Sequence, residues 1–141
     1  MSGPEVRPAA AGDLGAVAAI AKRKFAAGWS RAAFAGELGR PDSIFLVVPR
    51  RAYAIARVVE DDCRLLDIAA ESDGSGGGRA LLTALARAAK ERGCAKISLE
   101  VSALNARALS FYAKAGAKVV GRRPKFYNDG SDAVLMDLDL P

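Results

Sequence analysis

A glycine-rich segment lies between two patterned runs of this chain and limits the folds that are open to it. Four of the five residues from Gly74 to Gly78 are glycine. The run Arg64–Ala70 before them predicts a strand, and the apolar stripe after them predicts a helix over about Gly78–Arg92. Glycine lets a backbone approach a ligand closely, and a helix start offers N–H donors and a partial positive charge. The segment therefore predicts a strand–loop–helix unit suited to a pyrophosphate. It fits neither a P-loop nor a G-x-G-x-x-G fingerprint, and a plain flexible connection is the alternative.

The remainder of the chain alternates between helical and extended patterns. Two short helices come first and a three-strand meander follows them, whereas a strand, a helix and two strands follow the long helix. The expected order is ααβββαβαββ, and no linker or repeat divides residues 1–141. We therefore expect a single α/β (α+β) domain with a mixed, mostly antiparallel central sheet flanked by helices. The expected strands are residues 44–48, 52–59, 64–70, 95–101, 117–121 and 132–140.

The composition excludes several kinds of chemistry. Histidine is absent, so histidine metal ligands, Ser–His nucleophiles and histidine bases are excluded. Acid–base chemistry then depends on Glu, Asp, Tyr, Cys or Lys. The two cysteines are too few for a disulfide framework or a zinc cluster. Cys63, expected in a turn, and Cys94 are poor candidates for acyl carriers, and no metal is expected.

The charge pattern bears on partners and location. The net charge is +5, and the basic residues form short, scattered clusters with few aromatic neighbours. Such clusters argue against a nucleic-acid groove and suit a polyphosphate cofactor, although solvated surface charge also explains them. No apolar run approaches the roughly 18 residues of a membrane helix, and the N-terminus lacks the order of a signal peptide. We therefore expect a cytoplasmic protein without a membrane or nucleic-acid partner.

The run from Glu100 to Gly116 narrows the function. It reads EVSALNARALSFYAKAG and resembles the second half of the GNAT acetyltransferase domain. It is most similar to the RimI branch, the ribosomal-protein-alanine N-acetyltransferases. Residues 29–38, 66–70 and 122–133 resemble further segments of that branch in the same order. The resemblance runs from about residue 5 to residue 140.

The resemblance implies that acetyl-CoA is the co-substrate. It implies a GNAT-like fold whose central strands splay apart to admit the pantetheine arm, with the loop and the helix start holding the pyrophosphate. The implied cofactor-binding residues are Ile68, Ala69, Ala70, Gly74, Ser75, Gly76, Gly77, Gly78, Arg79, Asn105 and Tyr112. The two glycines of the family motif fall either on Gly76 and Gly78 or on Gly78 and Ala80. Asp73 or Ser75 then stands where the family usually has Gln or Arg.

Glu100 and Tyr112 are the expected catalytic pair. Acetyl transfer to an amine needs a neutral amine and a protonated leaving thiolate. Glu100, near the end of a predicted buried strand, is the expected general base, acting directly or through a water. The phenol of Tyr112 has an ordinary pKa near ~10, stays protonated and can donate to the thiolate. The alternatives are a solvated strand-end charge for Glu100 and a core aromatic packed on Leu109 for Tyr112.

The resemblance also implies an acceptor. It implies direct attack on bound acetyl-CoA by the N-terminal alanine amine of a ribosomal protein. Trp29 and Tyr127 are the expected acceptor-binding residues, with Tyr127 on a hairpin over Arg122–Asp132, where an aromatic on the surface of the hairpin is the alternative. Two other functions remain open: a degenerate GNAT domain with weak CoA binding and a non-catalytic binding role, and a GNAT enzyme acting on a small amine or a lysine. A monomer and a homodimer are both compatible with the sequence.

Overall fold

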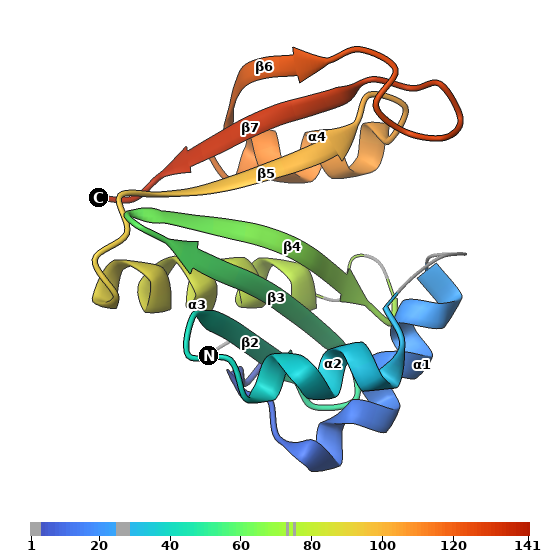
Figure 1. Ribbon diagram of the computed structural model, residues 1–141, viewed down its shortest axis with the longest axis vertical. Helices are drawn as coiled ribbons and strands as arrows, with labels where there is room; N and C mark the ends of the chain where they lie inside the picture. Colours follow the sequence, from blue (N-terminus) through green and yellow to red (C-terminus); the bar gives the residue numbers. More distant parts are fainter. Residues whose placement is uncertain (1–3, 25–28, 73, 75) are drawn as a thin grey trace.

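The computed structural model describes residues 4–24, 29–72, 74 and 76–141. Within them, seven strands form one sheet in the order β1-β2-β3-β4-β5-β7-β6 (Figure 1). The strands are β1 (Arg7–Pro8), β2 (Ser43–Val48), β3 (Ala52–Val59), β4 (Asp62–Ala70), β5 (Lys96–Ser102), β6 (Lys118–Arg123) and β7 (Ala133–Asp139). The helices are α1 (Leu14–Lys24), α2 (Arg31–Leu38), α3 (Gly77–Glu91) and α4 (Ala106–Lys114), with a short 3-10 turn at Ala11–Asp13.

The expected order ααβββαβαββ is confirmed, with one strand added. The sequence gives no sign of β1, because two residues, one of them Pro8, are too few to show an alternating pattern. β1 pairs with the outer edge of β2. In the part of the chain that the structure describes, no helix combines the length and the apolar character needed to cross a membrane.

The sheet opens between β4 and β5. These two strands are parallel and pair at three positions, from Asp62 opposite Lys96 to Arg64 opposite Ser98. Every other strand pair in the sheet is antiparallel. Beyond Arg64 the two strands separate, and Figure 1 shows them close at one end and wide apart at the other. The mixed, mostly antiparallel sheet with splayed central strands is therefore confirmed.

Two apolar cores lie on the two faces of the sheet. On one face, α3 packs its buried stripe of Leu81, Leu82, Leu85 and Ala89 against the strands, as the periodicity predicts, and Tyr112 of α4 belongs to the same core. On the other face, α1 and α2 cover a second core that includes Phe34 of α2 and Tyr53 of β3. The second core involves only β2, β3 and β4 of the sheet, whereas the first also includes residues of β5 and β7.

A β-bulge in β4 changes which side chains face α1 and α2. Ile55 of β3 pairs with Asp67, whereas its neighbour Ala56 pairs with Leu65, so Leu66 is an additional residue on β4. An additional residue reverses the alternation of side chains. As a result, Asp67 faces the α1–α2 side of the sheet. Cys63, expected in a turn, lies inside β4 instead and is fully buried on the α3 side.

Candidate active site

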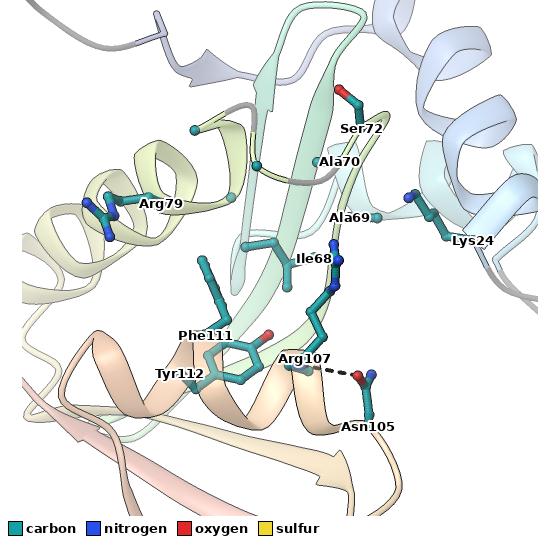
Figure 2. A pocket seen from close by; sticks show the side chains of 14 residues that line it. Lys24, Ile68, Ala69, Ala70, Ser72, Arg79, Asn105, Arg107, Phe111 and Tyr112 are labelled. Carbon is teal, nitrogen blue, oxygen red and sulfur yellow. Dashed lines mark hydrogen bonds between the residues drawn. The ribbon is translucent and has the colours of Figure 1, made fainter.

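A cleft of about 630 Å³ opens where β4 and β5 separate (Figure 2). Its walls are the end of β4, the glycine-rich loop, the start of α3 and the first turns of α4, and the end of α1 contributes one side chain. The lining residues are Lys24, Ile68, Ala69, Ala70, Ser72, Gly74, Gly76, Gly78, Arg79, Asn105, Arg107, Ala108, Phe111 and Tyr112. The structure therefore brings together most of the residues that the sequence assigns to the cofactor.

One backbone edge of β4 faces this cleft. Ile68, Ala69 and Ala70 pair with β3 along one edge. Along the other edge, the pairing with β5 has already ended at Arg64. The N–H and C=O groups of this edge are therefore placed to pair with an extended ligand, as the open edge of a sheet does.

The glycine-rich loop turns sharply into α3. Gly74 and Gly76 have φ angles of 78° and 86°, which lie in the left-handed region that glycine adopts without strain. Gly76 is the N-cap of α3, so the first turn of the helix and its partial positive charge begin at the cleft. At Gly78 a Cβ atom would lie 3.4 Å from the Phe111 ring, so α3 and α4 approach closely there. Asp73 and Ser75 lie outside the described residues, and both registers of the motif glycines stay open.

Three cationic side chains belong to the lining of the cleft. Arg79 comes from α3, Arg107 from α4 and Lys24 from the end of α1. Figure 2 shows Arg107 reaching from α4 toward the loop, whereas Arg79 turns away from it. Lys24 and Arg107 are not predicted as site residues by the sequence, although Lys24 ends the basic cluster Lys22–Lys24. Positive charge around a cleft favours an anionic ligand.

Asn105 has a structural role at the rim of the cleft. It is the N-cap of α4, and its Oδ1 accepts a hydrogen bond of 3.1 Å from the N–H of Ala108. This bond satisfies one of the N–H groups that a helix start leaves unpaired. Asn105 therefore fixes the start of the helix that carries Tyr112. Its predicted contact with the cofactor involves the remaining amide group and stays a prediction.

Tyr112 presents its hydroxyl to the cleft. The residue is only 7% exposed, and Figure 2 shows the phenol oxygen pointing away from α4 into the open space. None of the described residues forms a hydrogen bond with this hydroxyl. Burial raises the pKa of Tyr112 above its ordinary value, and the negative charge of Asp67 raises it further. The phenol therefore stays protonated and can serve as a hydrogen-bond donor to a ligand.

Glu100 does not line this cleft. Leu99 and Val101, its neighbours on β5, are buried in the same core as Tyr112, so Glu100 points to the opposite face of the strand. Its side chain is 37% exposed and forms an ion pair of 3.6 Å with Arg123. Glu100 is thus a partly exposed, ion-paired carboxylate. It approaches the opening between β4 and β5 from the side opposite to Tyr112.

The two expected acceptor residues lie on different segments. The pKa of Tyr127, in the connection between β6 and β7, is raised by partial burial and then by the negative charges of Glu100 and Asp129. The charge of Glu100 thus reaches Tyr127. Trp29 stacks on Phe34 of α2 with 5.4 Å between ring centroids. The acceptor contacts of both residues stay predictions.

Neither cysteine has the properties of a reactive nucleophile. Cys63 and Cys94 are buried. Burial raises the pKa of the Cys63 thiol to about 12, and it raises the pKa of the Cys94 thiol as well. Both thiols therefore stay protonated near neutral pH, and a thiol rather than a thiolate is a weak nucleophile. Among the described side chains, no cluster of three or more potential ligands is arranged to hold a metal ion.

Comparisons with known proteins agree with this geometry. A family model described as "Acetyltransferase (GNAT) family" matches residues 16–117. The [ribosomal protein bS18]-alanine N-acetyltransferase of Escherichia coli strain K12 is 36% identical over 136 residues, which cover 91% of this chain and 92% of that protein. The crystal structure of the ribosomal-protein-S18-alanine N-acetyltransferase from Escherichia coli superposes with a TM-score of 0.85 at 32% identity, over 96% of this chain and 93% of the other.

A more distant solved structure shares the fold. An aminoglycoside 6'-N-acetyltransferase complexed with coenzyme A superposes with a TM-score of 0.85 at 15% identity, over 97% of each chain. The family model covers well over half of the chain, and the Escherichia coli relative matches nearly all of it. This chain therefore belongs to the acetyltransferase (GNAT) family.

Proposed function

We propose that this protein transfers an acetyl group from acetyl-CoA to an N-terminal α-amine, that of an alanine at the start of a ribosomal protein. The observation that carries the proposal is the cleft itself: an open backbone edge of β4 leads to a glycine-rich helix start, and the Tyr112 hydroxyl faces the space between them. The similarity to an enzyme named for ribosomal-protein alanine acetylation supports the choice of acceptor.

The residues present fit acetyl-CoA. The edge at Ile68–Ala70 offers N–H and C=O groups to the amides of a pantetheine arm. The start of α3 at Gly76 and Gly77 offers a positive dipole end to a pyrophosphate. Lys24 and Arg107 add positive charge around the same cleft. Acetyl-CoA would supply the activated acetyl thioester in this position.

Glu100 and Tyr112 act on protons from opposite sides. Glu100 accepts a proton from the acceptor amine, directly or through a water, so that the nitrogen carries a free electron pair. Tyr112 holds its proton because its pKa is raised, and it donates that proton, or a hydrogen bond, to the leaving sulfur. Their positions on opposite sides of the opening between β4 and β5 match a reaction whose two reactants enter from different faces of the sheet.

The acceptor enters, in this proposal, from the face that carries Glu100. Tyr127 lies in the connection between β6 and β7, and the charge of Glu100 reaches it. Trp29 packs with α2 against the half of the sheet that contains β4. Between them these side chains would flank a peptide whose N-terminus points toward Tyr112. The cytoplasm, where ribosomal proteins are made, is the matching location.

The nature of the amine gives the first prediction. An α-amine has a pKa near ~8 and a lysine side chain near ~10.4, so near neutral pH the neutral fraction differs by about two hundredfold. With acetyl-CoA, we expect acetylation of an Ala-starting ribosomal-protein peptide at its N-terminus. The same peptide with its N-terminus blocked and an internal lysine left open should react at most about a tenth as fast. Mass spectrometry of the products, with a small polyamine as a third acceptor, measures the preference.

Two results would redirect the proposal. Faster acetylation of the lysine or of the polyamine than of the α-amine would mean that the acceptor is wrong although the chemistry is right. Absence of turnover with every amine, despite correct folding, would favour the degenerate GNAT domain, because the described loop contains no Gln or Arg of the family motif.

A further inference from the structure

Asp67 is a partly buried carboxylate on β4, in the part of that strand that is no longer paired with β5. It directly precedes Ile68–Ala70, the backbone edge that faces the cleft. Without the bulge at Leu66, the alternation of β4 would turn Asp67 toward α3. With the bulge, its side chain faces the α1–α2 side, which is the face that Glu100 shares.

The strand register places Asp67 and Glu100 at the same level of the opening. The last paired residues of β4 and β5 are Arg64 and Ser98. Glu100 lies two residues beyond Ser98, and Asp67 lies three residues beyond Arg64. One of those three is the additional residue Leu66 of the bulge, so both side chains lie at the same level. The side chain of Asp67 also acts on the far side of the opening, because its charge contributes to the raised pKa of Tyr112.

A packed set of aromatic rings holds the Asp67 carboxylate in place. The hydroxyl of Tyr53 donates a hydrogen bond of 2.6 Å to Oδ2 of Asp67. Tyr53 is fully buried, and its ring contacts Phe34 edge-on at 5.3 Å. Phe34 in turn stacks on Trp29. The orientation of Asp67 is thus set by a rigid core that continues to the expected acceptor site.

Asp67 also lacks a cationic partner. Within the described ranges of the chain, no lysine or arginine forms an ion pair with it, whereas Glu100 pairs with Arg123 and Asp62 with Arg64. The phenol of Tyr53 is hydrogen-bonded to Asp67, and the charge of Asp67 contributes to the raised pKa of Tyr112 across the opening. Burial raises the pKa of Asp67 itself. A partly buried carboxylate held in position without a cation is a site for a cationic group of a ligand.

We propose that Asp67 binds the α-ammonium group of the acceptor, with Tyr53 as its positioning residue, before Glu100 accepts the proton. This inference rests on the proposed function, because an N-terminal amine is the cation that it requires. Near neutral pH most of an α-amine with a pKa near ~8 is protonated. The ammonium group therefore arrives as a cation, and Asp67 offers a charge-assisted hydrogen bond beside the reacting centre.

The test compares two peptides that differ at one group. One is an Ala-starting peptide, and the other carries a hydroxyl in place of the α-amine. Titration calorimetry on the CoA-saturated protein measures the affinity for each. Wild type should prefer the amine peptide by about tenfold or more, as a charge-assisted hydrogen bond provides. Asp67→Asn keeps the shape and an acceptor for Tyr53 but should reduce the preference to about twofold or less. Tyr53→Phe should give an intermediate value.

Asp62→Asn is the matched control, since Asp62 lies on the same strand and the same face but where β4 and β5 are still paired. This variant should keep the full preference.

A preference that survives in Asp67→Asn would overturn the inference and leave the proposed function standing. The same holds if wild type acetylates the amine peptide but binds both peptides equally. Binding of acetyl-CoA shows whether each variant is folded. If Asp67→Asn does not fold, Asp67→Ser is used in its place. Failure of wild type to bind or acetylate the amine peptide would overturn both proposals.

Discussion

Tyr112→Phe is expected to lower kcat about a hundredfold or more while the Kd for acetyl-CoA changes little. The substitution removes a single hydroxyl that points into the cleft and has no hydrogen-bond partner among the described residues. Placement of a proton donor at a leaving group contributes about a hundredfold or more to the rate. The ring itself, packed in the core and in contact with Phe111, stays in place. Steady-state kinetics with saturating peptide and calorimetry with acetyl-CoA separate the two effects.

The pH dependence sharpens this expectation. Because burial and then the charge of Asp67 raise the pKa of Tyr112 above its ordinary value of about 10, the phenol remains protonated over the range from about pH 8 to about 10 in which the α-amine becomes neutral. Wild-type kcat should therefore show no loss between pH 8 and about 10 from ionisation of Tyr112. A Tyr112→Phe protein that keeps wild-type kcat would exclude Tyr112 as the proton donor.

Glu100→Gln is expected to lower kcat/KM for the peptide about a hundredfold near neutral pH. The variant keeps the length of the side chain but cannot accept the proton of the amine. The defect should shrink as the pH rises past the amine pKa of about 8, since the amine then reacts without a base. The pH profile of kcat/KM from pH 6 to about 10 measures this recovery.

Asp139→Asn provides the control for Glu100→Gln. Asp139 is also an exposed, ion-paired carboxylate of the sheet, at 3.9 Å from Lys118, but it lies at the far end of β7. Its substitution changes the net charge by the same amount and should leave kcat/KM near the wild-type value. A Glu100→Gln defect that persists unchanged at high pH would mean that Glu100 holds the acceptor or Arg123 in place and is not the general base.

The elements of the fold were predictable because each carries its own pattern. The stripe at Leu81, Leu82, Leu85 and Ala89 marks the buried face of α3, and all four side chains are buried. The bulge at Leu66 was not predictable, because it exists only in the pairing of β4 with β3. The sequence pattern of β4 does not indicate this reversal of side chains. It therefore does not predict which face of the sheet carries Asp67.

The sequence predicts which residues belong to the candidate site but not how their side chains are oriented. The spacing of Glu100 and Tyr112 identifies a strand end and a helix, but the face of each element depends on packing against the other layers. The strand pattern therefore leaves the exposure of Glu100 open, and its side chain is 37% exposed in the structure. Lys24 joins the cleft only because α1 ends near the glycine-rich loop. A short basic cluster alone does not distinguish that position from ordinary surface charge.

Titration of the protein with acetyl-CoA in a calorimeter measures whether the cleft binds this cofactor. We expect the β4 edge and the start of α3 to hold acetyl-CoA although the loop departs from the family motif. Binding should be saturable and one-to-one, with a Kd of about 1–100 µM, within the usual range for enzyme substrates. Absence of any binding at about 1 mM acetyl-CoA, in a sample that is folded, would contradict this expectation.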